Sequence, residues 1–148
     1  MDTCHLLDTI ANCVMALGAL LIFFQIRQSK MQAMAQFEDS LTGQYRQIIH
    51  GIPVNILFGT GLSDSEAGES LDDFLKYFDL CNEQAFLRQQ KKIRRNTWRF
   101  WADGMKSNFS RPPFRQAWAV IKAKAPSDFS ELRRLEQTDF LEDPATWK

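Results

Sequence analysis

The chain has 148 residues, 45% of them hydrophobic, and its 18 basic and 18 acidic residues give a formal net charge of zero. This length allows one domain with an appendage. The cysteines are three in number, show no C-x-x-C spacing and form no metal-ligand pattern with either histidine, which argues against a disulfide scaffold and against a zinc site. We therefore expect free thiols at Cys4, Cys13 and Cys81.

The neutral total conceals a strong segregation of charge along the chain. Residues 51–85 hold seven acids and one base, residues 86–125 hold eleven bases and one acid, and residues 126–148 hold six acids and three bases. Segregation of this kind bears on partners and self-association more than on the fold.

The first element is an uncharged apolar segment over residues 10–26. With Leu6 and Leu7 it spans about 20 residues, roughly the 30 Å of a bilayer core at about 1.5 Å per residue. A cleaved signal peptide would need basic residues before the segment and a small-residue cleavage motif after it, and neither is present. A buried core helix remains an alternative, but we interpret the segment as a retained transmembrane helix.

The flanking charges predict how this helix is oriented. Asp2 and Asp8 precede the segment, whereas Arg27 and Lys30 follow it. The positive-inside rule then places the N-terminus outside and the rest of the chain in the cytoplasm. We expect residues 1–27 to form the transmembrane helix with its short outer N-terminus, and residues 28–148 to form a cytoplasmic stalk and helical bundle.

Polar and small residues share one face of the predicted span. Asp8 and Asn12 are one helical turn apart, and Ala16 and Ala19 continue their face. In one interpretation Asp8 sits at the membrane interface and Asn12 hydrogen-bonds a neighbouring copy; in the other, the four residues line a pore. Both interpretations imply a homo-oligomer, and a pore implies four or more subunits.

The remaining elements read as helices. An apolar stripe continues from the span and ends at Gly51 and Pro53, facing either its own domain or another subunit. A loop then leads to Ser70, which we expect to cap an amphipathic helix that reaches toward Gln90. The apolar stripe consists of Met34, Phe37, Leu41, Tyr45 and Ile48. Further helices are expected over residues 91–105, 113–125 and 127–140. The inner face of the helix over 113–125 is expected to consist of Phe114, Ala117, Trp118 and Ile121.

The predicted fold class is therefore all-α: a transmembrane helix continuing into a stalk helix, followed by a cytoplasmic helical bundle. No serine, cysteine or histidine lies in a motif that marks an activated nucleophile, and Gly59-Thr60-Gly61 lacks the Lys-Ser/Thr of a phosphate loop. We predict no enzyme, no metal and no cofactor.

The basic stretch from residue 88 to residue 99 is the best candidate site. On one continuous helix its cations form a single stripe, and the neighbouring Trp98 is placed to stack a base, whereas Phe100 and Trp101 turn into the bundle. These are the parts that a nucleotide or oligonucleotide site needs. The predicted ligand-binding residues are Arg88, Lys91, Lys92, Arg95, Trp98 and Arg99.

Three other interpretations of this stretch stay open. The cations pair with the acids of residues 64–83 in the same or a neighbouring subunit, or they lie against anionic lipid headgroups of the inner leaflet. In the third interpretation, Trp98, Phe100 and Trp101 are ordinary core residues.

Two short motifs carry a family resemblance: Trp101-Ala-Asp-Gly104 and Phe114-Arg-Gln-Ala-Trp118. With the single span, the stalk and the acidic and basic helices, they resemble small bacterial membrane proteins such as the membrane effector of the Hailong anti-phage system. That resemblance implies a homo-oligomeric channel of the bacterial inner membrane, a cytoplasmic nucleic-acid site, and a nucleotidyltransferase partner that makes DNA-like oligomers to hold the channel shut.

The leading hypothesis is thus an oligomeric single-pass membrane effector, a channel or pore gated by an anionic cytoplasmic ligand. The alternative is a membrane anchor or adaptor that binds an acidic protein partner without forming a pore.

Overall fold

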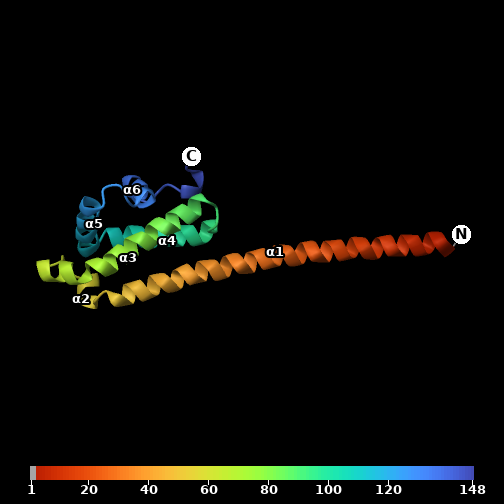
Figure 1. The fold of residues 1–148 in the computed structure, drawn as a ribbon, viewed down its shortest axis with the longest axis horizontal. Coiled ribbons are helices and arrows are strands. Elements are labelled where there is room, and N and C mark those ends of the chain that lie inside the picture. Colours follow the sequence, from red (N-terminus) through yellow and green to blue (C-terminus); the bar gives the residue numbers. More distant parts are fainter. Residues whose placement is uncertain (1–2) are drawn as a thin grey trace. The chain divides into compact units, whose positions relative to one another are not determined.

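A computed structural model of the chain is all-helical, as predicted, and contains no strand within the part that it describes. It describes the backbone of residues 3–148 and the side chains of Thr9, residues 12–63 and residues 65–148. The elements are α1 (Thr3–Gly51), α2 (Val54–Leu57), α3 (Asp64–Gln89), α4 (Arg95–Phe109), α5 (Pro112–Lys124), α6 (Ser130–Gln137) and a 3-10 turn, η1 (Pro144–Thr146) (Figure 1). Two compact units result, residues 1–37 and Glu38–Lys148.

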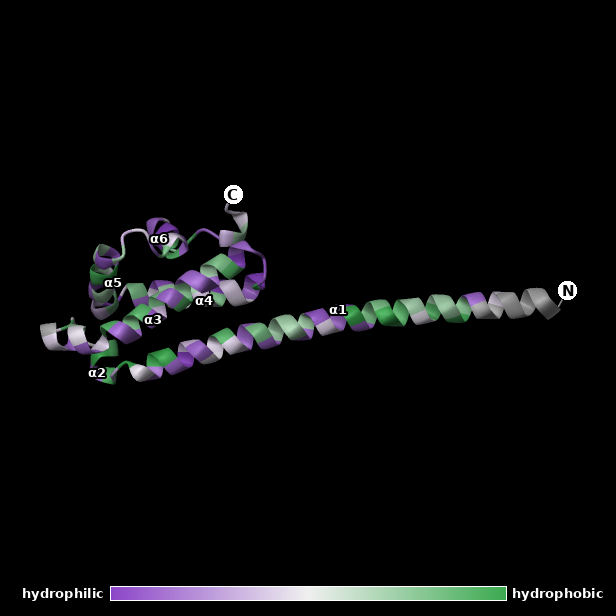
Figure 2. Ribbon diagram, viewed as in Figure 1, coloured by the Kyte–Doolittle hydropathy of each residue, from purple (hydrophilic) through white to green (hydrophobic). Residues whose placement is uncertain are grey.

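The first unit consists of the N-terminal part of α1. Its large apolar side chains from Val14 to Ile26 are exposed around the helix; Leu17, Phe23 and Phe24 are each about 60% accessible. Figure 2 shows the hydrophobic run along this part of the helix. By length and composition, α1 is long and apolar enough to cross a membrane, and none of the most apolar window is buried. Residues 28–37, the beginning of the expected stalk, also belong to this unit.

The last turns of α1 belong to the second unit and carry the predicted stripe into its core. Leu41 is 2% exposed, and Tyr45 and Ile48 are partly buried against the core. From Leu41 onward the stripe therefore faces its own domain. The helix ends at Gly51, as the sequence predicts.

Aromatic rings from three helices form the centre of the second unit. Phe78 of α3 lies with its ring centroid 5.4 Å from that of Phe109 of α4 and 4.9 Å from that of Trp118 of α5. Phe114 lies edge-on to Phe74 at 5.1 Å. The predicted inner face of α5 is confirmed, because Phe114, Ala117, Trp118 and Ile121 are all buried.

The predicted start of α3 is wrong. The helix begins about two turns earlier, where Ser63 and Glu66 form a capping box: Glu66 N–H donates to Ser63 Oγ at 3.3 Å, and Ser63 N–H donates to the Glu66 carboxylate at 3.0 Å. This pair satisfies two backbone donors at the helix end. Ser70 is instead 3% exposed in the interior of the helix.

Two boundaries near the C-terminus also differ from the prediction. α6 (Ser130–Gln137) is shorter than the helix predicted over residues 127–140, and it begins after Phe129, whose φ of 62° lies in the left-handed region. Residues 142–148, which follow the last predicted helix, include η1 with Pro144 buried. The tail therefore packs on the domain, and Asp143 lies just ahead of that turn.

Candidate anionic-ligand surface

The predicted continuous helix through the basic stretch is broken. α3 ends at Gln89, and Lys91 takes a φ of 57°. Lys91 N–H donates to the Arg88 carbonyl at 2.9 Å, and Lys92 N–H donates to the Leu87 carbonyl at 3.0 Å. These two bonds form a Schellman motif, which closes a helix with a left-handed residue. The single cationic stripe from Arg88 to Arg99 is therefore wrong.

Arg88 points into the domain instead of into solvent. It is 8% exposed; its Nε donates to Asp143 Oδ1 at 2.7 Å, and its Nη2 donates to Oδ2 at 2.6 Å. Its Nη1 donates to the Ile93 carbonyl at 2.7 Å. This bidentate arrangement is a strong form of charge-assisted hydrogen bond. Arg88 is thus a structural residue that holds the C-terminal tail and the α3–α4 connection.

Arg94 also forms an ion pair, with the buried Glu38 of α1. Its Nη2 donates to Glu38 Oε2 at 2.6 Å, and Thr97 Oγ1 donates to the same oxygen at 2.6 Å. Glu38 Oε1 accepts the backbone N–H of Arg94 at 2.7 Å. Burial alone would raise the pKa of Glu38, but these hydrogen bonds and the Arg94 charge outweigh it and lower the pKa. The carboxylate lies at the N-terminus of α4, where negative charge is favoured.

Trp98 and Phe100 have the opposite exposure from the one predicted for the ligand site. Trp98 is 2% exposed and belongs to the core, so it is not available to stack a ligand, whereas Phe100 is 76% exposed. Trp101 is buried, as predicted, and Ile93 is buried as well. α4 begins at Arg95, after the break, and the starting residue sets which side chains face inward.

Four of the six predicted ligand-binding residues remain exposed, and we call them the basic surface: Lys91, Lys92, Arg95 and Arg99. None of them makes an ion pair within the described part of the chain. Arg95 and Arg99 border a cavity of about 260 Å³ that Asp143 also lines. The hydrogen bond from Arg88 lowers the pKa of Asp143 most, and the charge of Arg95 adds to the shift.

The cations of residues 86–125 that form ion pairs in the described structure do so with acids outside α3. Lys106 pairs with Asp139, Lys122 pairs with Glu136, and Arg94 pairs with Glu38. Among the side chains that the structure describes, the acids of α3 that form ion pairs do so with Lys76. Of the interpretations left open for the basic stretch, pairing with residues 64–83 of the same chain is therefore wrong for the described side chains, and pairing with a neighbouring subunit stays a prediction.

The predicted pore-lining residues lie in the first unit. Asn12, Ala16 and Ala19 are exposed along α1. The side chain of Asp8 lies outside the described residues. No cluster of three or more His, Cys, Asp or Glu side chains within the described part could hold a metal ion.

No protein-family model matches the sequence, and neither a curated protein nor a solved structure is similar to it.

Proposed function

We propose that the protein crosses a membrane once, through residues 10–26, and carries its helical domain on the cytoplasmic side of the bacterial inner membrane. The exposed apolar surface of α1 supports this proposal most directly. Large side chains such as Leu21 (64% accessible) and Ile22 (58%) have no cover from the described residues. Burial in a bilayer stabilises such side chains by about 25 cal/mol per Å² of apolar area.

The second part of the proposal is that the basic surface binds an anionic ligand, a nucleotide or an oligonucleotide. The support is the exposure of Lys91, Lys92, Arg95 and Arg99 without ion-pair partners in the described chain, beside an exposed aromatic ring on Phe100. Cations follow the phosphates of a single strand and an aromatic ring stacks a base.

The third part concerns the output of the protein. A homo-oligomer of four or more subunits, with Asn12, Ala16 and Ala19 facing its axis, forms a pore that the bound ligand controls. An effector of this kind suits anti-phage defence, with a nucleotidyltransferase as the source of the ligand. Polar and small residues within a span support close helix association.

Ligand binding is tested with the full chain in lipid nanodiscs and a fluorescently labelled single-stranded oligonucleotide. Arg95→Glu combined with Arg99→Glu should weaken binding at least tenfold, because each phosphate contact contributes to a salt-dependent affinity. The matched control is Arg115→Glu with Lys124→Glu, two exposed cations of α5. Equal binding by the double variant and the wild type would remove the basic surface as the site.

Pore formation is tested by ion flux from liposomes that contain the purified protein. Asn12→Leu should alter the flux, and Val14→Leu is the matched control within the span. The second candidate, an anchor that binds an acidic protein, is favoured by the burial of Trp98, which removes an indole from the basic surface. A monomer or dimer without flux would support the anchor, whereas a closed ring of four or more subunits supports the pore.

A further inference from the structure

A cavity of about 530 Å³ opens within the second unit, between the end of α1, α3 and α4. Its walls are mostly aromatic and apolar: Tyr45 from α1, Tyr77 and Cys81 from α3, and Trp101 and Met105 from α4. Volumes between about 300 and 1,000 Å³, with apolar walls and a few polar groups, are typical of small-molecule sites. None of the residues of the basic surface lines it.

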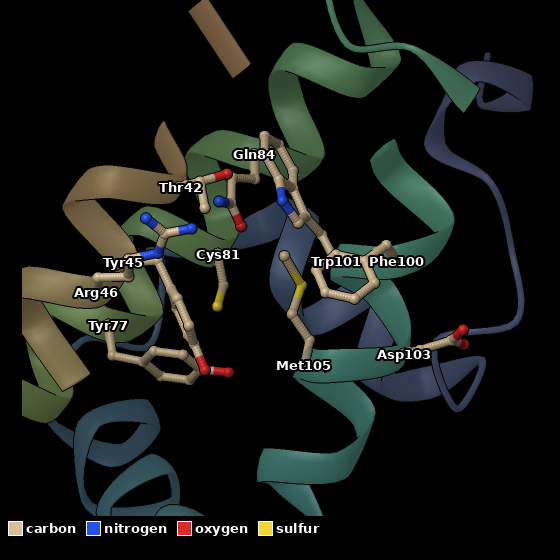
Figure 3. A pocket seen from close by; sticks show the side chains of 11 residues that line it. Thr42, Tyr45, Arg46, Tyr77, Cys81, Gln84, Phe100, Trp101, Asp103 and Met105 are labelled. Carbon is tan, nitrogen blue, oxygen red and sulfur yellow. The ribbon is translucent and has the colours of Figure 1, made fainter. Parts of the chain in front are cut away.

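Gln84 supplies the observation that points to a ligand. Its side chain lines the cavity, is 4% exposed, and has no hydrogen-bond partner within the described part of the chain. Figure 3 shows its amide directed into the same space as the sulfur of Cys81 and the side chain of Met105. Among the described residues, the fully enclosed side-chain nitrogen or oxygen without a partner is Trp118 Nε1, so the unpaired amide atoms of Gln84 remain open to the cavity. Because buried polar groups in native proteins almost always have partners, an amide that faces a cavity in this way is available to a ligand there.

The other polar groups around the cavity limit what its ligand can be. Tyr77 accepts a hydrogen bond from Asn108 at 3.0 Å, so that its oxygen is partly satisfied. Burial raises the pKa of the Cys81 thiol to about 12, which keeps this part of the wall uncharged at neutral pH. Arg46 and Asp103 lie at opposite sides of the cavity (Figure 3), so the charges at its edge cancel.

We propose that this cavity binds an uncharged, planar aromatic molecule whose edge carries adjacent hydrogen-bond donor and acceptor groups. A primary amide such as that of Gln84 offers two N–H donors beside a carbonyl acceptor, and a carboxamide or lactam edge is complementary to both. The rings of Tyr45, Tyr77 and Trp101 supply faces and edges for aromatic contact. The exposed ring of Phe100 also lines the cavity, whereas the four cations of the basic surface do not. The proposal for the cavity does not depend on whether the basic surface binds an anion.

The test compares two probes of similar size, naphthalene-2-carboxamide and 2-ethylnaphthalene, at equal free concentrations. The full chain is held in lipid nanodiscs, and its thermal unfolding is followed by tryptophan fluorescence. All four tryptophans lie between residues 98 and 147, so the signal reports the helical domain. A ligand that binds only the folded state raises the unfolding temperature. We expect the carboxamide to bind about tenfold tighter than the hydrocarbon, which corresponds to one or two hydrogen bonds.

Gln84→Met keeps the volume of the side chain and removes the amide. It should abolish the preference for the carboxamide while 2-ethylnaphthalene still binds, whereas Gln137→Met, at an exposed position of α6, should change neither. Gly104→Leu is a second variant at the cavity, because an added Cβ there meets no heavy atom within 4 Å. A leucine in that space should weaken both probes.

Three results would overturn the proposal: no stabilisation by either probe, equal affinity for both in the wild type, or a preference that survives in Gln84→Met. The Arg95→Glu/Arg99→Glu variant should bind the carboxamide like the wild type. That comparison distinguishes failure of the cavity from failure of the basic surface.

Discussion

Asp143 accepts two hydrogen bonds from Arg88, across 55 residues of sequence, at 2.7 and 2.6 Å. The side chain of Arg88 is 10% exposed and that of Asp143 is 28% exposed. Asp143 also accepts the backbone N–H of Ala145 at 3.0 Å and so caps η1. One carboxylate therefore fixes the C-terminal tail, neutralises a buried guanidinium and removes that cation from the candidate ligand surface.

Asp143→Ala should destabilise the domain by about 2–3 kcal/mol. The substitution leaves the Arg88 charge buried without a partner, which costs about 3–5 kcal/mol when both partners are fully buried and less when one partner is partly exposed. Urea unfolding followed by tryptophan fluorescence measures the change. Lys106→Ala breaks the more exposed pair with Asp139 and should cost no more than about 1 kcal/mol. Equal costs for the two variants would contradict the structural role of Arg88.

The stability of the domain should fall at acid pH. Hydrogen bonds from Arg88 lower the pKa of Asp143. Burial acts to raise the pKa of Glu38, but the hydrogen bonds from Arg94 and Thr97 outweigh burial, so the pKa of Glu38 is lowered as well. The unfolded chain then binds more protons than the folded chain in acid, so stability rises with pH in that range. The contribution is fully present above the ordinary carboxyl pKa of about 4 and is lost as pH falls through the lower folded-state values.

Thermal unfolding between pH 7 and pH 2.5 measures this loss. Glu38→Gln should be less stable than the wild type at pH 7 and should lose less stability in acid, because the substituted side chain no longer titrates. A wild-type unfolding temperature that rises as the pH falls from 5 to 3 would contradict the assigned direction of both pKa shifts.

Lys91→Gly should stabilise the domain by about 1 kcal/mol. Lys91 holds a φ of 57°, which costs an L-residue roughly 1–2 kcal/mol, whereas glycine adopts it freely and loses part of that gain through the entropy of the unfolded chain. Lys92→Gly is the matched control, since Lys92 has no positive φ, and it should be neutral or destabilising. Chemical denaturation of the three proteins side by side measures the difference.

Gly104→Ala should also stabilise the domain, by about 0.5–1 kcal/mol. Gly104 lies within α4 without a positive φ, and an added Cβ meets no heavy atom within 4 Å. Glycine within a helix costs about this much relative to alanine. Gly59→Ala provides the contrast, because its Cβ would come within 2.7 Å of the Asn55 carbonyl oxygen. A stabilising effect at Gly59 would show that the close approach is absent in solution.

Local sequence patterns determined much of the helical fold. The uncharged run over residues 10–26 and the stripe from Leu41 to Ile48 follow from composition and helical period, which neighbouring residues set by themselves. The inner face of α5, with Phe114, Trp118 and Ile121, follows in the same way, because Pro112 and Pro113 occupy the first turn and the helical period then places these three residues on one face.

Tertiary structure alone decided where the basic stretch breaks and which of its side chains face solvent. No glycine or proline lies between Gln89 and Arg95 to signal the end of a helix. The break is stabilised by partners far along the chain: Glu38 accepts hydrogen bonds at the start of α4, and Asp143 holds Arg88. Long-range ion pairs of this kind leave no periodic trace in the sequence. They buried Arg88 and left Lys91, Lys92, Arg95 and Arg99 on the surface.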